Sequence, residues 1–461
     1  MGALGSQHPV STLNPSRCPA LLIAAPASGQ GKTTVTAALA RLHTRQGRRV
    51  RVFKCGPDFL DPFWHTLATG APVHQLDLWM TGETDCRARL HEAAQQADLI
   101  LVEGVMGLYD GQPSAADLAQ HFGLPVLAVI DASAMAGTFG ALAYGLQHYQ
   151  PGLRWAGVLA NRVGSARHAG MLQQGLRDPQ AWLGGLQRDA ALVLPERHLG
   201  LVAATELADA QQRLDAAADA LADTPLGRLT LDELRTRWGV DFPRPAASAP
   251  MPPLLQGRTV AVASDAAFCF IYAANIECLQ QLGAHVVFFS PLKDSALPVC
   301  DAVWLPGGYP ELHAARLAAN LGLRDSLRAH VAAGKPLWAE CGGMMALFER
   351  LTDGAGVSHA LWGLLPGGVA LQKRLAALGP QALRVDGGEL RGHTFHYSTC
   401  DTPLRPALRT TRPAGGLGEG EAVYRQGSLV ASYFHAWFPS DPALVARLFG
   451  TGLLQAQELA A

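Results

Sequence analysis

Two stretches of this sequence carry residue types that could do chemistry. In "APASGQGKTT" (25–34) glycines precede a lysine and two threonines, and in "PLWAECGG" (336–343) a cysteine ends an apolar run and is followed by two glycines. A glycine-rich loop before a helix aims backbone N–H groups at phosphates. A cysteine at a sharp strand-to-helix turn is exposed, and a helix N-terminus favours its thiolate. The two stretches predict a nucleotide site and a nucleophilic thiol.

The first stretch departs from the GxxxxGK[ST] pattern because Pro26 replaces the first glycine. A Gly-Lys-Thr sequence at a helix start can also arise without nucleotide binding, but the apolar run before it favours a phosphate loop. We expect five of its residues to contact ATP: Gly29, Gly31, Lys32, Thr33 and Thr34.

Charged residues follow two further apolar runs. "KCGPDFLDPFWH" (54–65) and "LILVEGVMGLYDG" (99–111) contain Lys54, Asp58, Asp61, Glu103 and Asp110. Because parallel strands place their carboxyl ends at one edge of a sheet, these side chains should converge on the phosphate loop. A plain alternative stays open for Asp58 and Asp61, which could only cap turns beside prolines.

Carboxylate and hydroxyl oxygens are the ligands that Mg²⁺ prefers, together with nucleotide phosphates. The expected magnesium ligands are Thr33, Asp58 and Glu103. Lys54 is expected at the ATP phosphates, and Asp61 and Asp110 are expected to act in substrate activation.

A nucleophilic thiol needs a base and donors for an oxyanion. His435 in "SYFHAWF" is the candidate base for Cys341, and the backbone N–H groups of Gly308 and Gly342 are the candidate oxyanion donors. The alternatives are an inert buried cysteine and a histidine that packs among aromatic side chains.

These residues need strands and helices to position them. Short apolar runs alternate with helical patterns over residues 19–240: "ALLIAA", "RVRVF", "DLILVE", "LPVLAVID", "WAGVLAN" and "ALVLP". The rhythm restarts with "TVAVAS", "AHVVFFSP", "DAVWLPGG" and "PLWAEC". Such runs predict parallel sheets covered on both faces. From about residue 360, "GGVALQ", "FHYSTC" and "LVASYFHAWF" suggest an antiparallel extension.

Five prolines between Pro243 and Pro253 predict a linker between two domains. The expected organisation is a flexible tail (1–18), a P-loop ATPase domain (19–240), the linker (241–256), a second α/β domain (257–450) and a C-terminal tail (451–461).

Composition excludes several classes of function. The chain has 461 residues, 37 Lys and Arg against 38 Asp and Glu, and a formal net charge of −1, which offers no general attraction to nucleic acid or anionic membranes. No apolar run approaches 18 residues, so we expect no membrane span. The eight cysteines show no CxxC pair. A cytoplasmic location is expected.

The first domain resembles the dethiobiotin-synthetase-type ATPases, which phosphorylate a substrate carboxylate. More narrowly, "KCGPDFLDPFWH", "VEGVMGLYDG", "NRVGS" and "LPERHLGLV" resemble the cobyrinic acid a,c-diamide synthase family. The set around Cys341 resembles class I glutamine amidotransferases, in which a Cys–His pair releases ammonia from glutamine. Many of those carry a glutamate two residues after the histidine, where this chain has Trp437. No third member of the site is assigned.

The resemblance implies a P-loop NTPase-like domain joined to a glutamine amidotransferase-like domain, acting as a carbon–nitrogen ligase of cobalamin biosynthesis. It implies a corrin substrate amidated on its a and c acetate side chains, with L-glutamine as nitrogen donor, ATP as co-substrate and Mg²⁺ as cofactor. It also implies that Asn161 reads adenine and makes a homodimer the candidate assembly. Neither nucleic acid nor a membrane is an expected partner.

Three points stay open. The ring could contain cobalt or lack it, and a cobyric acid synthase-like amidase of other side chains is the nearest alternative. A regulatory P-loop switch with an inactive amidotransferase domain is an alternative of another class. The segments "DAAFCFIYAANIECL" and "RGHTFHYS" fit the family as well, and there Phe268, Phe270, Tyr272, Asn275, His393 and His396 could line a site or fill a core.

Overall fold

The computed structural model describes residues 16–192, 194–197, 200–201, 207–246, 251–413 and 418–451. Most of both expected tails and positions 247–250 of the proline-rich segment lie outside these residues. The chain forms two compact units that meet in sequence between Ser248 and Ala249. Two short segments of the N-terminal half, Gly56–Leu60 and Trp79–Gly82, group with the second unit.

The first unit is built on a parallel sheet of order β3-β2-β4-β1-β5-β6-β7, whose first strand also pairs antiparallel with β10. The strands are β1 (Ser16–Ala24), β2 (Val50–Cys55), β3 (His74–Leu76), β4 (Leu99–Glu103), β5 (Val126–Asp131), β6 (Trp155–Val163), β7 (Trp182–Gln187) and β10 (Gly239–Phe242). A separate two-stranded sheet pairs β8 (Glu196–Arg197) with β9 (Gly200–Leu201).

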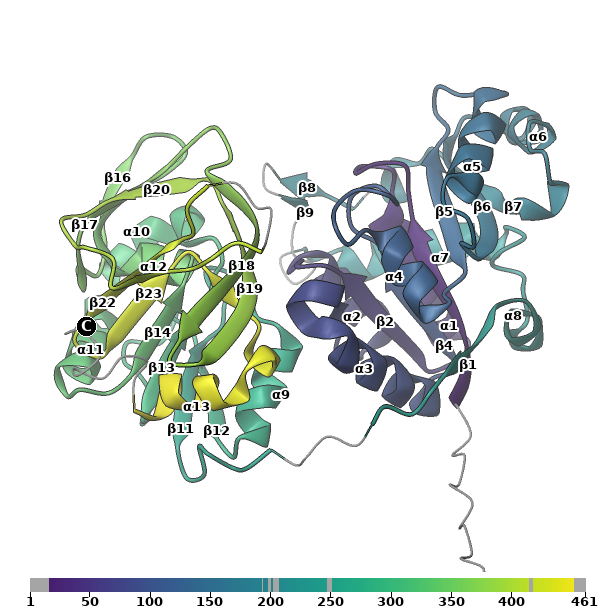
Figure 1. Cartoon of the computed structure of the whole chain (residues 1–461). Helices are drawn as coiled ribbons and strands as arrows, with labels where there is room; N and C mark the ends of the chain where they lie inside the picture. Colours follow the sequence, from purple (N-terminus) through teal and green to yellow (C-terminus); the bar gives the residue numbers. More distant parts are fainter. Residues whose placement is uncertain are drawn as a thin grey trace, which may run out of the picture. The chain divides into compact units, whose positions relative to one another are not determined.

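Helices cover both faces of this sheet (Figure 1). Leu21 and Ile23 of β1 pack on the side of α1, α2, α7 and α8, whereas Leu22 faces α3, α4, α5 and α6. Burial on both faces explains why these strands read as unbroken apolar runs. The helices are α1 (Lys32–Arg45), α2 (Asp61–Thr69), α3 (Glu83–Gln96), α4 (Ala115–Phe122), α5 (Thr138–His148), α6 (Ala166–Gln174), α7 (Ala210–Ala222) and α8 (Leu231–Trp238).

The second unit has a central sheet of order β12-β11-β13-β14-β23-β22-β21, parallel from β12 to β23 and antiparallel beyond. Its strands are β11 (Thr259–Ala263), β12 (His285–Phe289), β13 (Ala302–Leu305), β14 (Leu337–Glu340), β21 (Leu408–Arg409), β22 (Ala422–Gln426) and β23 (Leu429–Ser432). The helices are α9 (Ala273–Gln281), α10 (Ala314–Ala319), α11 (Leu321–Ala332), α12 (Gly342–Leu347) and α13 (Pro442–Gly450).

Two smaller sheets complete this unit (Figure 1). One has the order β16-β15-β17-β20 and the other the order β18-β19-β24. Their strands are β15 (Phe348–Thr352), β16 (Ser358–Ala360), β17 (Leu365–Leu371), β18 (Ala377–Val385), β19 (Gly388–His396), β20 (Ser398–Asp401) and β24 (His435–Ala436).

The expectation of two α/β units with mostly parallel sheets is confirmed, but four details differ. Residues 16–18 belong to β1 rather than to a tail, and β10 continues the first unit to Phe242. "ALVLP" contains a short 3-10 turn (Ala190–Leu192) instead of a strand. The seventh strand is β7, whose two glycines hid it. "LVAS" is β23, a parallel strand of the central sheet rather than part of the antiparallel extension.

Among the described residues, the structure contains no helix that is both long and apolar enough to cross a membrane.

Candidate functional site

The glycine-rich loop connects β1 to α1 in the first unit. Gly29 and Gly31 both have positive φ, at 75° and 96°, which a residue with a side chain adopts with strain. A Cβ on Gly31 would lie 2.1 Å from Asn161 Nδ2, and this amide donates to Gln30 O at 2.9 Å. Asn161, near the end of β6, therefore packs directly on the glycine-rich loop. This is the residue that was expected to contact the adenine of ATP.

Lys32 begins α1, and its side chain folds back over the loop. Its Nζ donates to Ala27 O at 3.2 Å and to Met106 O at 2.6 Å. Burial and the neighbouring Lys54 lower the pKa of Lys32, while three carboxylates raise it. The lysine is thus held close to the loop by carbonyl groups, which a phosphate could replace as its partners.

Glu103, at the end of β4, is the centre of a buried cluster. Its Oε1 accepts from Thr33 Oγ1 at 2.7 Å and lies 3.2 Å from Lys54 Nζ, while Oε2 contacts His65 Nε2. Lys54 Nζ is also 2.6 Å from Asp61 Oδ2 at the start of α2. The carboxyl ends of β2 and β4 therefore meet the start of α1, as parallel strands require.

Opposing effects set the charge of Glu103. Burial raises its pKa, but Lys54, His65 and Thr33 together hold the pKa of this carboxyl below its ordinary value. The group is therefore ionised at neutral pH. An ionised carboxylate beside the Thr33 hydroxyl is a donor set that suits Mg²⁺ bound to nucleotide phosphates.

The other expected residues divide between the two units. Asp110 accepts from Gly107 N at 2.8 Å in the loop after β4, and Thr34 lies half-buried in the first turn of α1. Asp58 groups with the second unit, where its Oδ1 accepts from Leu60 N at 2.8 Å. Burial lowers the pKa of His393 to about 3, and the charge of Asp58 opposes this shift. Asp61 joins the Lys54–Glu103 cluster.

The part of the chain that the structure describes contains no group of three or more His, Cys, Asp or Glu side chains that could hold a metal ion. This does not conflict with a nucleotide-bound Mg²⁺, which takes one or two protein oxygens and completes its shell with phosphates and water.

Cys341 lies in a sharp elbow between β14 and α12. Its φ is 45° and its ψ is −107°, a strained conformation for a residue with a side chain. A Cβ on Gly343 would lie 2.1 Å from Leu305 O, and one on Gly342 would lie 2.9 Å from Gly308 N. The elbow therefore requires glycine after the cysteine, and it brings the two expected oxyanion donors together.

The thiol itself is buried. Burial, followed by the charge of Glu311, raises the pKa of Cys341, and a backbone hydrogen bond from Gly342 lowers it less. This differs from the expectation that the helix N-terminus would favour a thiolate. Burial outweighs the Gly342 N–H at the start of α12, which favours the thiolate. A base must remove the proton.

His435 begins β24, and its ring packs against the same turn as the elbow. A Cβ on Gly307 would lie 2.4 Å from His435 Cε1, next to the Gly308 backbone that meets Gly342. Burial, together with His393 and His396, lowers the pKa of His435 well below its ordinary value. The imidazole is therefore neutral, the form that can accept a proton.

Aromatic rings surround His435. His393, its cross-strand partner, stacks on it with a centroid separation of 4.9 Å, and Phe59 lies 5.1 Å away. Phe59 also stacks on Phe270 at 5.0 Å and on Tyr272 at 4.3 Å. Phe59, Phe270 and His393 thus pack around His435, and Tyr272 packs on Phe59 and His393.

The other residues of the two family-like segments serve the fold. Phe268 is fully buried in the core, and Asn275 joins the segment after His435 through Ala436 O and Phe438 N. His396 contacts Glu421 Oε1 at 3.2 Å.

Sequence reasoning missed two residues that the structure places in these sites. His65 lies one helical turn after Asp61 and contacts Glu103, so its spacing in "DPFWH" was an available signal. Phe59 has no local signal, because its packing on His435 joins residues far apart in the sequence.

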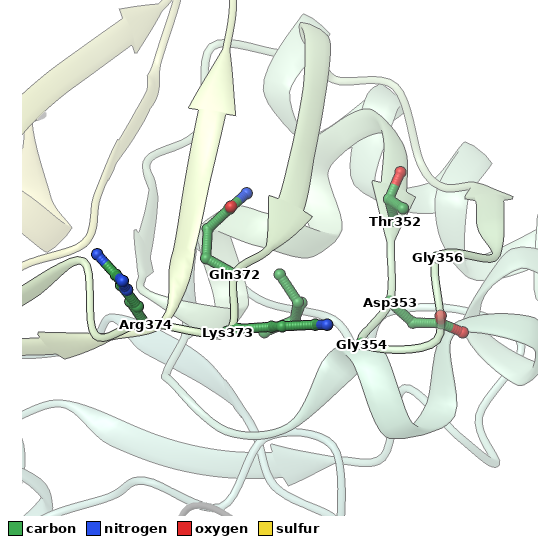
Figure 2. A pocket seen from close by; sticks show the side chains of 8 residues that line it. Thr352, Asp353, Gly354, Gly356, Gln372, Lys373 and Arg374 are labelled. Carbon is green, nitrogen blue, oxygen red and sulfur yellow. The ribbon is translucent and has the colours of Figure 1, made fainter.

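A surface pocket of about 520 Å³ lies elsewhere in the second unit. In Figure 2, Lys373 extends toward the turn at Gly354, whereas Arg374 points away from it. None of the candidate site residues lines the pocket, whose walls are Thr352, Asp353, Gly354, Gly356, Leu371, Gln372, Lys373 and Arg374.

Known proteins resemble both units of this chain. Residues 21–202 match the CobQ/CobB/MinD/ParA nucleotide binding domain, and residues 259–443 match the CobB/CobQ-like glutamine amidotransferase domain. A hydrogenobyrinate a,c-diamide synthase of Pseudomonas aeruginosa is 58% identical over 94% of this chain and 98% of its own length. One from Stutzerimonas stutzeri is 57% identical over 94% and 98%, and a cobyrinate a,c-diamide synthase of Herminiimonas arsenicoxydans is 51% identical over 93% and 96%.

Proposed function

The chain belongs to the family of hydrogenobyrinate and cobyrinate a,c-diamide synthases, which makes it a glutamine-dependent amide-forming ligase, and we propose how its residues divide the reaction. The first unit activates a carboxylate with ATP, and the second unit releases ammonia from glutamine at Cys341. The observation that carries the proposal is that the strained elbow at Cys341 and the neutral His435 both pack on the Gly307–Gly308 turn.

A carboxylate is a poor acceptor for ammonia because its oxygen leaves badly. Transfer of the γ-phosphoryl group of ATP to the substrate carboxylate gives an acyl phosphate with a good leaving group. Lys32 and Lys54 stabilise the charge that develops on the phosphates, and Thr33 with Glu103 would hold Mg²⁺ there. When bound, Mg²⁺ neutralises phosphate charge and orients the transferred group.

In the second unit, His435 takes the thiol proton and Cys341 Sγ attacks the side-chain amide carbon of glutamine. The N–H groups of Gly308 and Gly342 stabilise the oxyanion. His435 then gives the proton to the amide nitrogen, and the C–N bond breaks to release ammonia and leave the glutamyl thioester. Water then hydrolyses the thioester to glutamate.

For the substrate we propose hydrogenobyrinate, amidated on its a and c acetate groups. The support is the activity of the relatives at 58% and 57% identity, both of which are hydrogenobyrinate a,c-diamide synthases. Supplying the cobalt-containing and metal-free rings in parallel, with ATP and glutamine, and following product mass tests this choice. For the compartment we propose the cytoplasm, where a nucleophilic thiol stays reduced.

Replacing the nucleophile tests the division of labour. Cys341→Ala should abolish amidation with glutamine, while a high concentration of ammonium at mildly alkaline pH should restore the product, because free ammonia can reach the acyl phosphate. His435→Ala should behave similarly, and Lys32→Ala should fail with either nitrogen source. Cys300→Ala is the matched control, since that buried cysteine also lies near a histidine, 3.9 Å from His330 Nδ1. A folded Cys341→Ala protein that uses glutamine at the parental rate would refute the proposal.

A further inference from the structure

One nitrogen of His435 is left without a partner. In this unit His435 Nδ1 is buried and makes no hydrogen bond to any described residue. A base that takes a thiol proton through one ring nitrogen normally has the other held by an acceptor, which fixes the tautomer. The place where related sites carry a glutamate, two residues after the histidine, holds Trp437 here.

A carboxylate nevertheless lies close to that nitrogen. Glu340 is the last residue of β14, directly before Cys341, and its Oε2 is 3.9 Å from His435 Nδ1. Its side chain is 2% exposed and that of His435 is 1% exposed. The distance exceeds a hydrogen bond, but catalytic hydrogen bonds are often long in the absence of substrate.

The second carboxylate oxygen explains why Glu340 points this way. Its Oε1 accepts from Trp338 Nε1 at 2.7 Å and from the backbone N–H of Ala436 at 3.3 Å. Trp338 comes from the same face of β14, and Ala436 follows the histidine in β24. One oxygen is thus fixed by two donors, and the other is left facing His435.

We propose that Glu340 is the positioning residue of the Cys341–His435 pair, accepting the Nδ1–H of His435 so that Nε2 is free to take the thiol proton. The inference rests on the glutaminase role proposed for Cys341 and His435. It places the acceptor immediately before the nucleophile in sequence instead of two residues after the base. When His435 becomes an imidazolium, the carboxylate stabilises its charge.

The ionisation of Glu340 gives this arrangement a pH dependence. Burial raises the pKa of Glu340 to about 8. When protonated, its Oε2 can only donate to Nδ1, which leaves the proton of the neutral ring on Nε2 and blocks the base. The rate of glutamine hydrolysis should therefore rise with pH through about 8. The other titratable groups around the pair are His393 and His396, which lower the pKa of His435, and Glu311 and Glu421, which raise that of Cys341.

Glu340→Gln is the diagnostic change. The amide oxygen can keep the hydrogen bonds from Trp338 and Ala436, so the fold is preserved, but the amide nitrogen then faces Nδ1 as a donor and imposes the wrong tautomer. We expect kcat for glutamine hydrolysis to fall by at least about 10²-fold, with KM changed little and the rise near pH 8 removed, as for a triad carboxylate replaced by its amide. Ammonium-dependent amidation should stay at the parental rate. Glu340→Asp, which retains the charge, should recover part of the loss.

Glu389→Gln is the matched control, because Glu389 lies in the same unit and pairs with Arg384 at the surface, away from the Cys341–His435 pair. It should hydrolyse glutamine within about threefold of the parental rate. If Cys341→Ala and His435→Ala lose glutamine hydrolysis while Glu340→Gln keeps it, the inference about Glu340 fails and the proposed function stands. If Cys341→Ala keeps it, both fail.

If a Glu340 variant does not fold, a measurement on the parental protein tests the inference. Nitrogen-15 NMR of labelled histidine, with His435→Ala used for assignment, reports which ring nitrogen carries the proton. At pH 9 we expect the Nδ1–H tautomer of His435. An Nε2–H tautomer at that pH would overturn the inference.

Discussion

At the scale of single residues, the first unit depends on one buried carboxylate that serves several partners. Glu103 accepts from Thr33 and lies beside Lys54 and His65. Its pKa stays low because these partners outweigh burial. Removing its charge would take one carboxylate partner from the buried Lys54, which also pairs with Asp61.

Glu103→Gln should therefore reduce amide formation by about 10²–10³-fold, the usual loss when an electrostatic contact to the transition state is removed. Glutamine hydrolysis should survive, because Cys341 lies in the other unit. Steady-state assays with glutamine and with ammonium measure the two activities separately. Glu92→Gln, the same change at an exposed position of α3, is the control. Parental synthesis by Glu103→Gln would contradict the role of this cluster.

At the scale of elements, the position of the Cys341 thiol depends on close backbone packing at Gly342 and Gly343, where a side chain would not fit. The elbow holds Cys341 at a positive φ, and α12 begins where the backbones of Gly342 and Gly308 meet. A strand that ended without this elbow would place the cysteine in the core as an inert thiol. The two glycines that follow it are therefore part of the site.

Gly343→Ala tests this requirement. The added methyl group would lie 2.1 Å from Leu305 O, so the elbow or β13 must move. We expect the second unit to lose about 1–3 kcal/mol of unfolding free energy, a typical cost of overpacking, and glutamine hydrolysis to fall. Urea unfolding together with a glutaminase assay measures both. Gly354→Ala is the control, since nothing lies within 4 Å of its Cβ position. Equal stability and activity of the two variants would rule out the steric argument.

At the scale of the whole molecule, two short segments from the N-terminal half of the chain belong to the second unit. Gly56–Leu60 lies between β2 and α2 of the first unit, yet Phe59 of this segment packs on His435. The residues on either side of the segment return to the first unit, where Lys54 and Asp61 form an ion pair. The Lys54–Asp61 ion pair of the first unit and Phe59 of the second unit therefore come from one short stretch of the chain.

Charge is the second property of the whole chain. With a formal net charge of −1, the protein has no general attraction for a substrate that carries several carboxylates. Lys, Arg or helix N-termini must therefore meet those carboxylates locally.

Substrate binding should accordingly weaken as salt rises, because partly exposed ion pairs are screened over about 10 Å at 0.1 M salt. Calorimetric titration of the corrinoid at 0.05 M and 0.5 M salt measures the change in Kd. A corrinoid whose side chains are fully amidated is the control and should bind with little salt dependence. If the carboxylated ring has the same Kd at both salt concentrations, the prediction is wrong and apolar contacts hold the ring.

The sequence by itself determined the two α/β units, and it predicted the phosphate loop and the pairing of a thiol with a distant histidine. These signals are local or periodic: apolar runs of strand length, glycines beside Lys32 and Cys341, and the proline-rich segment after Phe242. Local backbone chemistry and burial on two faces are sufficient to produce such patterns. The local pattern misled at two places. Two glycines interrupt the apolar pattern of β7, which is a strand, and the apolar run "ALVLP" contains a 3-10 turn.

Only the tertiary structure decided which side chains meet. It placed Asp61 beside Lys54, added His65 to Glu103, and put Phe59 on His435. It also revealed Glu340 behind His435, although Glu340 is adjacent to Cys341 in sequence. The physical reason is that such contacts join elements far apart in the chain. Burial then sets the protonation of these groups, raising the pKa of Cys341 and lowering that of His435, and no sequence pattern records it.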